Sequence, residues 1–301
     1  MTRLTQRLAA FSALALLSAV VSTAHAQFFF PNDDTINYTL PHNTYVGYAS
    51  QNDLYNRISP TSPTFNLISG GSIAGFLEAY NSSTVNLITG ASVGSVVSAY
   101  DSSKVNISGG SVGAGLYATS SSTVNIRGGS IRYRLEARGS SKVNISGGSI
   151  GDTLHAYDYS IVTMSGGSSG HSLNAHDSSR LTMSGGSIIG GLFASSFGTV
   201  DLSGGSVSGE LVIRDSGALN IFGRGLVALL VDPNYFGSYS LYSLSGKLLD
   251  GTVLTNKDLY IQNGTDARFT LTEVVPEPGS LALLVGCIGV LPLLVLRRRR
   301  K

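Results

Sequence analysis

Five polar residues near the middle of the chain are of types that carry out acid–base and binding chemistry. They are Glu136, Arg138, His155, Tyr157 and His176, and the steps 136 to 155, 138 to 157 and 157 to 176 are each 19 residues long. A carboxylate and an imidazole can transfer protons, while a guanidinium and a phenol donate hydrogen bonds to oxygen atoms. If residues 19 apart lie side by side, the five form a surface patch that contacts or cleaves a carbohydrate. The alternative is a solvated face of mixed composition.

The acidic residues argue against cleavage by a pair of carboxylates. That mechanism needs two carboxyl groups about 5–10 Å apart. On the outward positions that supply the patch, no two acids fall in one repeat or at the same place in adjacent repeats. We therefore predict no catalytic residues and a protein that is not an enzyme.

Metal and cofactor sites are not predicted either. Asp101, Asp158, Asp177 and Asp215 share one turn position, but the row is interrupted and Ca²⁺ takes six or more oxygens, so we expect these acids to cap turns. His171 and His176 lie five apart in a non-helical stretch, which is a poor arrangement for zinc. The paired glycines recur in every repeat and precede no helix, which argues against a phosphate-binding loop. No G-x-S-x-G elbow of a serine hydrolase stands out from the repeat.

The elements that position these residues are repeats of about 20 residues. The middle residue of a Val-Asn-Ile-like triplet recurs after 20 residues twice and after 19 residues from then on, at Asn66, Asn86, Asn106, Asn125, Asn144, Thr163, Thr182, Asp201 and Asn220. A constant period of this length is typical of a solenoid, in which each coil packs on its neighbours.

Residues 103–121 show the layout of one coil. Val105–Asn106–Ile107 and Leu116–Tyr117–Ala118 alternate apolar and polar side chains, as strands with one buried face do. Gly109–Gly110 provides a sharp turn because glycine tolerates positive φ, and Asp-Ser-Ser or Asn-Ser-Ser in most copies provides another. We expect Val, Ile, Leu and Ala rows inside the stack. The Asn row should point outward and either brace the stack or form a glycan-binding stripe.

The sequence therefore predicts an all-β protein, a parallel β-helix of about eight to nine coils of 19–20 residues over residues 64–222. The frame and the convex helix of a leucine-rich repeat are absent. Residues 27–63 and 223–274 lack the period and are expected to cap the ends, the second with turns at Asp232–Pro233–Asn234 and Asp250–Gly251. In architecture the coil resembles β-helical bacterial surface proteins and, more distantly, the pectin-lyase-like fold.

Residues 1–26 are typical of a secretory signal peptide. Two arginines precede an apolar stretch at residues 8–21, and Ala24 and Ala26 are the small residues before a cleavage site. We therefore expect export, with signal peptidase as the first processing partner. An uncleaved anchor is the alternative, although the apolar run is short for a membrane span.

Residues 275–301 combine three features. The tripeptide Pro276, Glu277, Pro278 comes first, followed by 18 uncharged residues that include the single cysteine of the chain. As a helix those 18 residues reach roughly 27 Å, about the thickness of one hydrocarbon core. A basic cluster ends the chain and should stay cytoplasmic, which leaves the body outside; it contains Arg297, Arg298, Arg299 and Arg300, and then a lysine.

This tail resembles the PEP-CTERM sorting signal of Gram-negative bacteria. The resemblance implies that a membrane-embedded exosortase recognises the tail and cuts near Pro276–Glu277–Pro278. It also implies a precursor anchored in the inner membrane, and a product in the cell envelope, on the cell surface or outside the cell. An ordinary single-pass anchor is the alternative.

The charge balance argues against nucleic acid as a partner. Of the 20 basic residues, seven lie in the leader and the terminal cluster, so the body has 13 basic and 18 acidic residues. It has no basic stripe of the kind that binds phosphate backbones. A hydrophobic content of 42% is enough for a buried core rather than a disordered chain.

These observations predict an exported structural or adhesive protein. The PEP-CTERM resemblance links it to exopolysaccharide and the biofilm matrix, with no cofactor. The alternative is a polysaccharide lyase or hydrolase on a pectin-lyase-like scaffold. A third possibility is a module that self-assembles through the ends of its solenoid.

Overall fold

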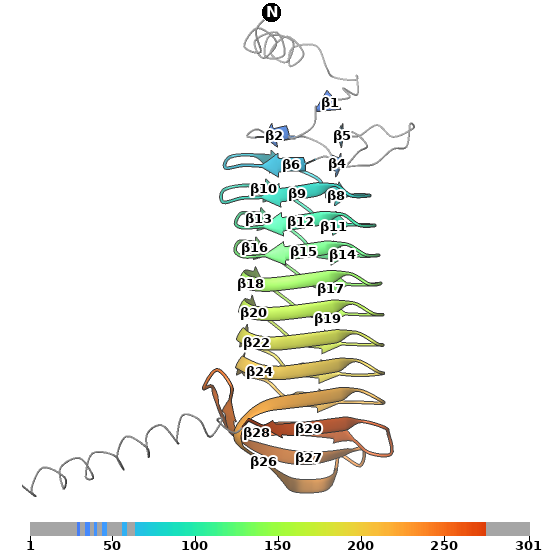
Figure 1. The fold of residues 1–301 in the computed structure, drawn as a ribbon, viewed down its shortest axis with the longest axis vertical. Coiled ribbons are helices and arrows are strands. Elements are labelled where there is room, and N and C mark those ends of the chain that lie inside the picture. The colour runs from blue at the N-terminus through green and yellow to red at the C-terminus, as the bar shows by residue number, and fades with distance from the viewer. Residues whose placement is uncertain are drawn as a thin grey trace, which may run out of the picture.

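The computed structural model describes residues 64–274 and, between residues 29 and 58, five short strands. Over these residues the chain is an all-β parallel solenoid of about eight coils of roughly 19 residues, without a helix. The coils stack into a straight rod whose C-terminal end is closed by longer strands (Figure 1). The predicted fold class is confirmed.

Each of the first coils contributes three short strands, which stack into three parallel columns. The first column holds the Val-Asn-Ile segments: β6 (Thr64–Leu67), β9 (Thr84–Leu87), β12 (Lys104–Ile107) and β15 (Thr123–Ile126). The second holds β7 (Ser72–Ile73), β10 (Ser92–Val93), β13 (Ser111–Val112) and β16 (Ser130–Ile131). The third runs the whole length of the rod: β8 (Leu77–Ala79), β11 (Val97–Ala99), β14 (Leu116–Ala118), β17 (Leu135–Ala137), β19 (Leu154–Ala156), β21 (Leu173–Ala175), β23 (Leu192–Ala194) and β25 (Leu211–Ile213).

From residue 142 onward the first two strands of each coil merge into one bent strand of nine residues. These strands are β18 (Lys142–Ile150), β20 (Ile161–Ser169), β22 (Arg180–Ile188) and β24 (Thr199–Val207). Their pairings shift register at the Ser-Gly-Gly corner, for example between Met164 and Ser168 of β20. The corner therefore behaves as a bulge within a continuous strand.

The register places equivalent residues of successive coils directly above one another. Val105 pairs with Val85 on one side and with Val124 on the other, and Leu116 pairs with Leu135. All of these side chains are at most 1% exposed. The predicted Val, Ile, Leu and Ala rows therefore form one continuous core along the axis.

Two turns of every coil need a backbone conformation with positive φ. The corner after the first column contains a glycine with φ between 78° and 89°, at Gly70, Gly90, Gly110, Gly129, Gly148, Gly167, Gly186 and Gly205. From Gly110 onward this is the second glycine of a Gly-Gly pair. The turn after the third column has φ between 53° and 65°, at Asn81, Asp101, Ser120, Gly139, Asp158, Asp177, Ser196 and Asp215. Asn, Asp and Gly tolerate this region better than other residues, which explains their frequency in this row.

The segment before the first repeat continues the stack. β2 (Asp34–Ile36), β3 (Thr39–Leu40) and β4 (Thr44–Val46) pair in parallel with β6, β7 and β8. β5 (Asn56–Ile58) pairs with β4, and β1 (Phe29–Phe30) pairs with β5. This part of the chain thus forms a further turn of strands although its sequence does not repeat.

Four longer strands close the C-terminal end. They are β26 (Ala218–Tyr235), β27 (Tyr239–Leu248), β28 (Val253–Gln262) and β29 (Arg268–Glu273). β26 begins as a coil strand paired with β24 and then leaves the stack to form an antiparallel hairpin with β27. β28 returns as a parallel neighbour of β25, and β29 as a parallel neighbour of the first part of β26.

The predicted hairpin turn at Asp250–Gly251 is present between β27 and β28. The predicted turn at Asp232–Pro233–Asn234 is wrong, because β26 continues through these residues and the chain reverses after Tyr235. Two shifts of register, on either side of Asp232, let the strand accommodate a proline without ending there.

Candidate functional site

The five residues of the predicted patch lie together on one outer face of the third column. Glu136 of β17 pairs with His155 of β19. Arg138, Tyr157 and His176 each directly follow a strand of this column, and Tyr157 and His176 bond through their backbone N–H to the coil before. The spacing of 19 therefore brings the patch residues side by side, as the period predicts.

The rings of the patch form a parallel stack. The Tyr157 and His176 ring centroids are 4.9 Å apart with an interplanar angle of 11°. The His155 ring lies 5.6 Å from that of Tyr157 and 5.8 Å from that of His176, again nearly parallel. The guanidinium carbon of Arg138 lies 4.6 Å from the Tyr157 centroid, and His176 Nδ1 lies 2.7 Å from the hydroxyl of Ser195. The stack therefore follows the rod axis over several coils.

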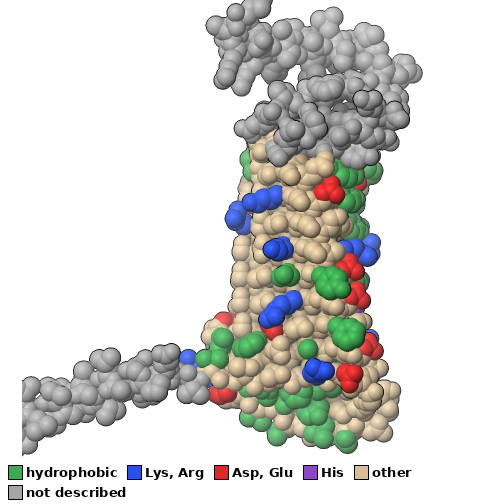
Figure 2. Space-filling view, turned by 45° about the vertical axis from the view of Figure 1, so that its right-hand side comes forward, with side chains coloured by type: hydrophobic (Ala, Val, Ile, Leu, Met, Phe, Trp, Pro, Cys, Tyr) green, Lys and Arg blue, Asp and Glu red, His purple; other side chains and the backbone are tan. Residues whose placement is uncertain are grey.

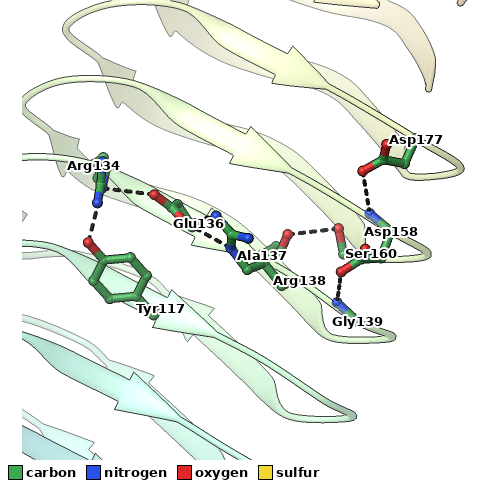
Figure 3. Close-up of polar contacts among 9 residues, drawn as sticks. All are labelled: Tyr117, Arg134, Glu136, Ala137, Arg138, Gly139, Asp158, Ser160 and Asp177. Atoms are coloured by element: carbon green, nitrogen blue, oxygen red, sulfur yellow. Dashed lines mark hydrogen bonds and ion pairs between the residues drawn. The ribbon is translucent and has the colours of Figure 1, made fainter. Parts of the chain in front are cut away.

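Glu136 is held between two guanidinium groups (Figure 3). Its side chain is buried, with Arg134 Nε 2.8 Å from Oε1 and Arg138 Nη2 2.8 Å from Oε2. The Arg134 Nε also donates to the hydroxyl of Tyr117 on the preceding coil, at 3.0 Å. Both carboxylate oxygens are thus occupied by charge-assisted hydrogen bonds.

The surroundings shift the protonation equilibria of the patch. Burial lowers the pKa of His155, and the neighbouring His176 lowers it further. Burial also lowers the pKa of His176. Burial and the Glu136 carboxylate raise the pKa of the Tyr157 phenol. At neutral pH both imidazoles and the phenol are therefore uncharged, and the charge of the patch resides in the Glu136 ion pairs.

This arrangement supports contact more readily than proton transfer. The carboxylate is directed at arginines of its own face, and the rings lie flat on one another along the stack. A general acid or base must reach the proton that it transfers. A flat row of rings with hydrogen-bonding edges can contact a ligand that lies along the rod.

The predicted turn acids bond to the backbone of the coil before their own (Figure 3). Asp158 Oδ2 accepts the backbone N–H of Gly139 at 2.7 Å, and Asp177 Oδ2 accepts that of Asp158 at 3.3 Å. Asp101 does the same for Asn81 at 2.9 Å. These acids therefore cap turns, as expected, and each cap joins two coils.

The Asn row braces the stack. Asn86 Nδ2 donates to Asn66 Oδ1 at 2.7 Å, and the same bond links Asn106 to Asn86, Asn125 to Asn106 and Asn144 to Asn125. Each amide in the middle of this ladder uses one donor and its oxygen for its neighbours. The role in ladder stabilisation is therefore confirmed.

Three features of the surface were not predicted from the sequence. Arg134 joins the patch because it lies two residues before Glu136, outside the 19-residue register used to find the others. Arg180 forms an ion pair with Asp201, which also accepts from Asn220 Nδ2 at 2.8 Å. The third feature is an aromatic cleft at the C-terminal end, lined by Glu210, Val212, Arg214, Tyr235, Phe236, Tyr239 and Tyr260. The sequence feature that could have indicated this cleft is the cluster of aromatic residues at 235–239, which follows the end of the repeat.

Several predicted features lie outside the described residues. They are the cleavage-site residues Ala24 and Ala26, the tripeptide Pro276–Glu277–Pro278, and the basic cluster 297–300. Residues 64–274 contain no group of three or more His, Cys, Asp or Glu side chains arranged to hold a metal ion. In the part of the chain that the structure covers, no helix is long and apolar enough to span a membrane.

The fold and its outer face define a parallel β-solenoid rod, braced by polar ladders and carrying an arginine–aromatic patch on its third column. Comparison with known proteins found no matching family model, curated protein or solved structure.

Proposed function

We propose that this protein is an exported, non-enzymatic structural or adhesive rod of the cell envelope. The observation that carries the proposal is the direction of its outward polar groups. The Asn ladder, the turn carboxylates and the Tyr157–His176 stack all bond along the rod axis, from coil to coil. Such ladders stiffen a rod and present a repeating surface, which suits a scaffold or an adhesin.

The patch supports the same proposal. The Glu136 carboxylate, which acid–base cleavage of a glycan would use, is neutralised by Arg134 and Arg138. The alternative, a polysaccharide lyase or hydrolase, needs a carboxylate or imidazole that reaches the substrate. The two imidazoles are stacked on each other, and His176 Nδ1 is engaged by the Ser195 hydroxyl, which favours contact with a saccharide over its cleavage.

The delivery of the rod is proposed from its two ends. The leader at 1–26 directs export and is removed by signal peptidase. The tail at 275–301 anchors the precursor and presents it to an exosortase. The last described residue, Val274, donates its backbone N–H to Gly223 at the closed end of the rod. In this proposal the anchor joins the rod at its C-terminal end. The resemblance of the tail to the PEP-CTERM signal implies an association with exopolysaccharide.

Incubation of the full-length protein with acidic and neutral polysaccharides tests the non-enzymatic assignment. We expect no new reducing ends and no unsaturated products. Products that form with the wild type and disappear in Glu136→Gln, Arg138→Ala or His155→Ala would establish the lyase or hydrolase alternative. A Lys104→Ala variant is the matched control, because Lys104 is an exposed residue of another column.

Processing in the native host tests the sorting assignment. Replacement of Pro276, Glu277 and Pro278 by alanine should leave an uncleaved precursor that stays with the membrane. Val275→Ala, just outside the tripeptide, should be processed like the wild type. Equal processing of the triple variant and the wild type would reject recognition by an exosortase.

A further inference from the structure

The aromatic cleft lies at the C-terminal end of the same outer face as the patch. Strand pairing runs from His155 through Asn174, Phe193 and Val212 to Tyr260, which lines the cleft. The other walls come from the hairpin between β26 and β27 and from residues that flank β25. The cleft has a volume of about 190 Å³. Pockets that enclose drug-sized ligands measure about 300–1,000 Å³, so this one fits a single small ring.

Phe236 occupies the mouth of the cleft in an unfavourable backbone conformation. It is 86% exposed and has φ of 49°, followed by Gly237 with φ of 73°. Two consecutive positive φ values define the hairpin turn that favours Asn-Gly, and a bulky side chain at the first position is strained. A large apolar ring is thus kept in solvent at a cost in stability, a combination that clusters at ligand sites.

Neighbouring rings hold this aromatic wall in place. The Tyr235 and Phe236 centroids are 4.4 Å apart, edge to face, and those of Tyr235 and Tyr260 are 5.4 Å apart. Burial, together with nearby acidic groups, raises the pKa of Tyr260 to about 12, so the hydroxyl adds no charge to the cleft. Rigid aromatic residues bind with a low cost in conformational entropy.

The charged residues of the cleft point to the kind of ligand. The guanidinium carbon of Arg214 lies 6.0 Å from the ring centroid of Tyr239, and Glu210 also lines the cleft. Arg214 disfavours a cationic ligand, and the opposite charges of Arg214 and Glu210 leave no net charge to attract an ion. Glu210 and Arg214 flank opposite ends of β25, so they supply a carboxylate acceptor and a guanidinium donor at separate places on the cleft wall. Hydroxyl groups both donate and accept, so a ring that carries several of them can use both.

We propose that this cleft binds one neutral sugar ring of a saccharide. Phe236 and Tyr239 lie against the apolar face of the ring, while Glu210, Arg214 and the Tyr260 hydroxyl bond to its hydroxyl groups. The inference rests on the proposed adhesive function and gives it a ligand class and a place on the rod.

Calorimetric titration of the full-length protein in detergent tests this site. The probes are neutral gluco-, manno- and galacto-oligosaccharides, with choline as the cationic comparison. Phe236→Asn creates the preferred Asn-Gly turn, so it should raise or maintain the melting temperature while it weakens oligosaccharide binding about tenfold or more. Phe197→Asn is the matched control, since Phe197 is also exposed but does not line the cleft, and it should bind like the wild type.

The outcomes separate this site from the function on which it rests. Binding of an oligosaccharide that Phe236→Asn leaves unchanged would overturn the site and keep an adhesive rod. The absence of binding to every neutral probe, or tighter binding of choline, would overturn the ligand class. Cleavage of the probe during titration would instead reject the non-enzymatic assignment.

Discussion

The stacking of coils predicts a graded response to alanine at three glycines. Gly225 has φ of 59° and open space around the position of a Cβ atom, so Gly225→Ala tests the backbone conformation alone. Gly151 lacks positive φ, but a Cβ there would collide with the carbonyl oxygen of Arg132 on the coil before. Gly148 combines both, with φ of 83° and a Cβ position 2.9 Å from the carbonyl oxygen of Gly129.

The magnitudes follow from these two causes. A non-glycine residue in the left-handed region costs roughly 1–2 kcal/mol, and insertion of a methyl group into a close-packed contact costs roughly 1–3 kcal/mol. We therefore expect Gly225→Ala to lower the free energy of unfolding by about 1 kcal/mol. Gly151→Ala should lower it by about 3 kcal/mol, the upper end of the packing range, because its Cβ would lie closest to a backbone oxygen. Gly148→Ala should lose about 2 kcal/mol, since the cost of positive φ adds to that of a milder contact.

Urea unfolding of the full-length variants, followed by far-ultraviolet circular dichroism, measures the differences. The order of the three variants matters more than any single value. Equal losses for Gly148→Ala and Gly225→Ala would refute the reasoning, because contact between coils would then contribute nothing at the Gly-Gly corner. A Gly151→Ala variant as stable as the wild type would refute it as well.

Three further predictions concern the polar side chains. Asn125→Ala removes two side-chain hydrogen bonds of 2.9 Å, one to each neighbouring asparagine, and should lower the free energy of unfolding by about 1–2 kcal/mol, as denaturant titration would show. Glu136→Gln should cost about 1–2 kcal/mol in the same measurement, because the side chain is buried between exposed arginines. Glu210 is exposed, so Glu210→Gln should stay within about 0.5 kcal/mol of the wild type. Burial lowers the pKa of His155 and His176, so the folded state binds fewer protons than the unfolded state, whose imidazoles titrate near 6.5. The melting temperature should therefore fall as the pH drops below about 6.5, and the His155→Asn, His176→Asn double variant should flatten this dependence; an unchanged slope would contradict it.

The rows of equivalent side chains could be predicted because the sequence has two periods, one along each strand and one from coil to coil. A step of 2 along the strand assigns Val105 and Ile107 to the core and Asn106 to the surface, and a step of 19 or 20 places each beside its copy. The patch was found by the same rule, since its members are related by steps of 19. Arg134 was not found by this rule, because its contact with Glu136 depends on side-chain direction rather than on the 19-residue step.

Polar residues inside the corner of the coil could not be predicted in this way. The third residue of the turn after the third column is a buried serine in six coils, at Ser83, Ser103, Ser122, Ser141, Ser160 and Ser179. Composition alone describes this turn as polar and solvated. The tight corner accepts only a small side chain. In the later coils the serine hydroxyl donates a hydrogen bond to a backbone carbonyl, as Ser160 does to Ala137 at 3.1 Å (Figure 3).

Of the C-terminal strands, the turn between β27 and β28 was predicted, but the length of β26 was not. The residues of Asp232–Pro233–Asn234 favour a turn individually, yet the pairing of β26 with β27 carries the strand past them. The part of β26 that pairs with β27 exposes apolar side chains, with Val227, Leu229, Leu230 and Val231 about half exposed or more. Hydrophobic side chains accordingly gather at the C-terminal end of the rod, while Lys and Arg are scattered singly along its length (Figure 2).

The place where the period ends is also the place where a concave site can form. In a parallel stack every side chain of a column points the same way as its copies about 4.8 Å above and below, so a coil presents flat ladders. A cleft needs side chains that converge from different directions. The β26–β27 hairpin supplies them, because it runs antiparallel across the end of the third column and turns Phe236 and Tyr239 toward residues that flank β25. For a rod of this kind, the irregular terminal strands can add ligand selectivity that the repeat itself is too uniform to provide.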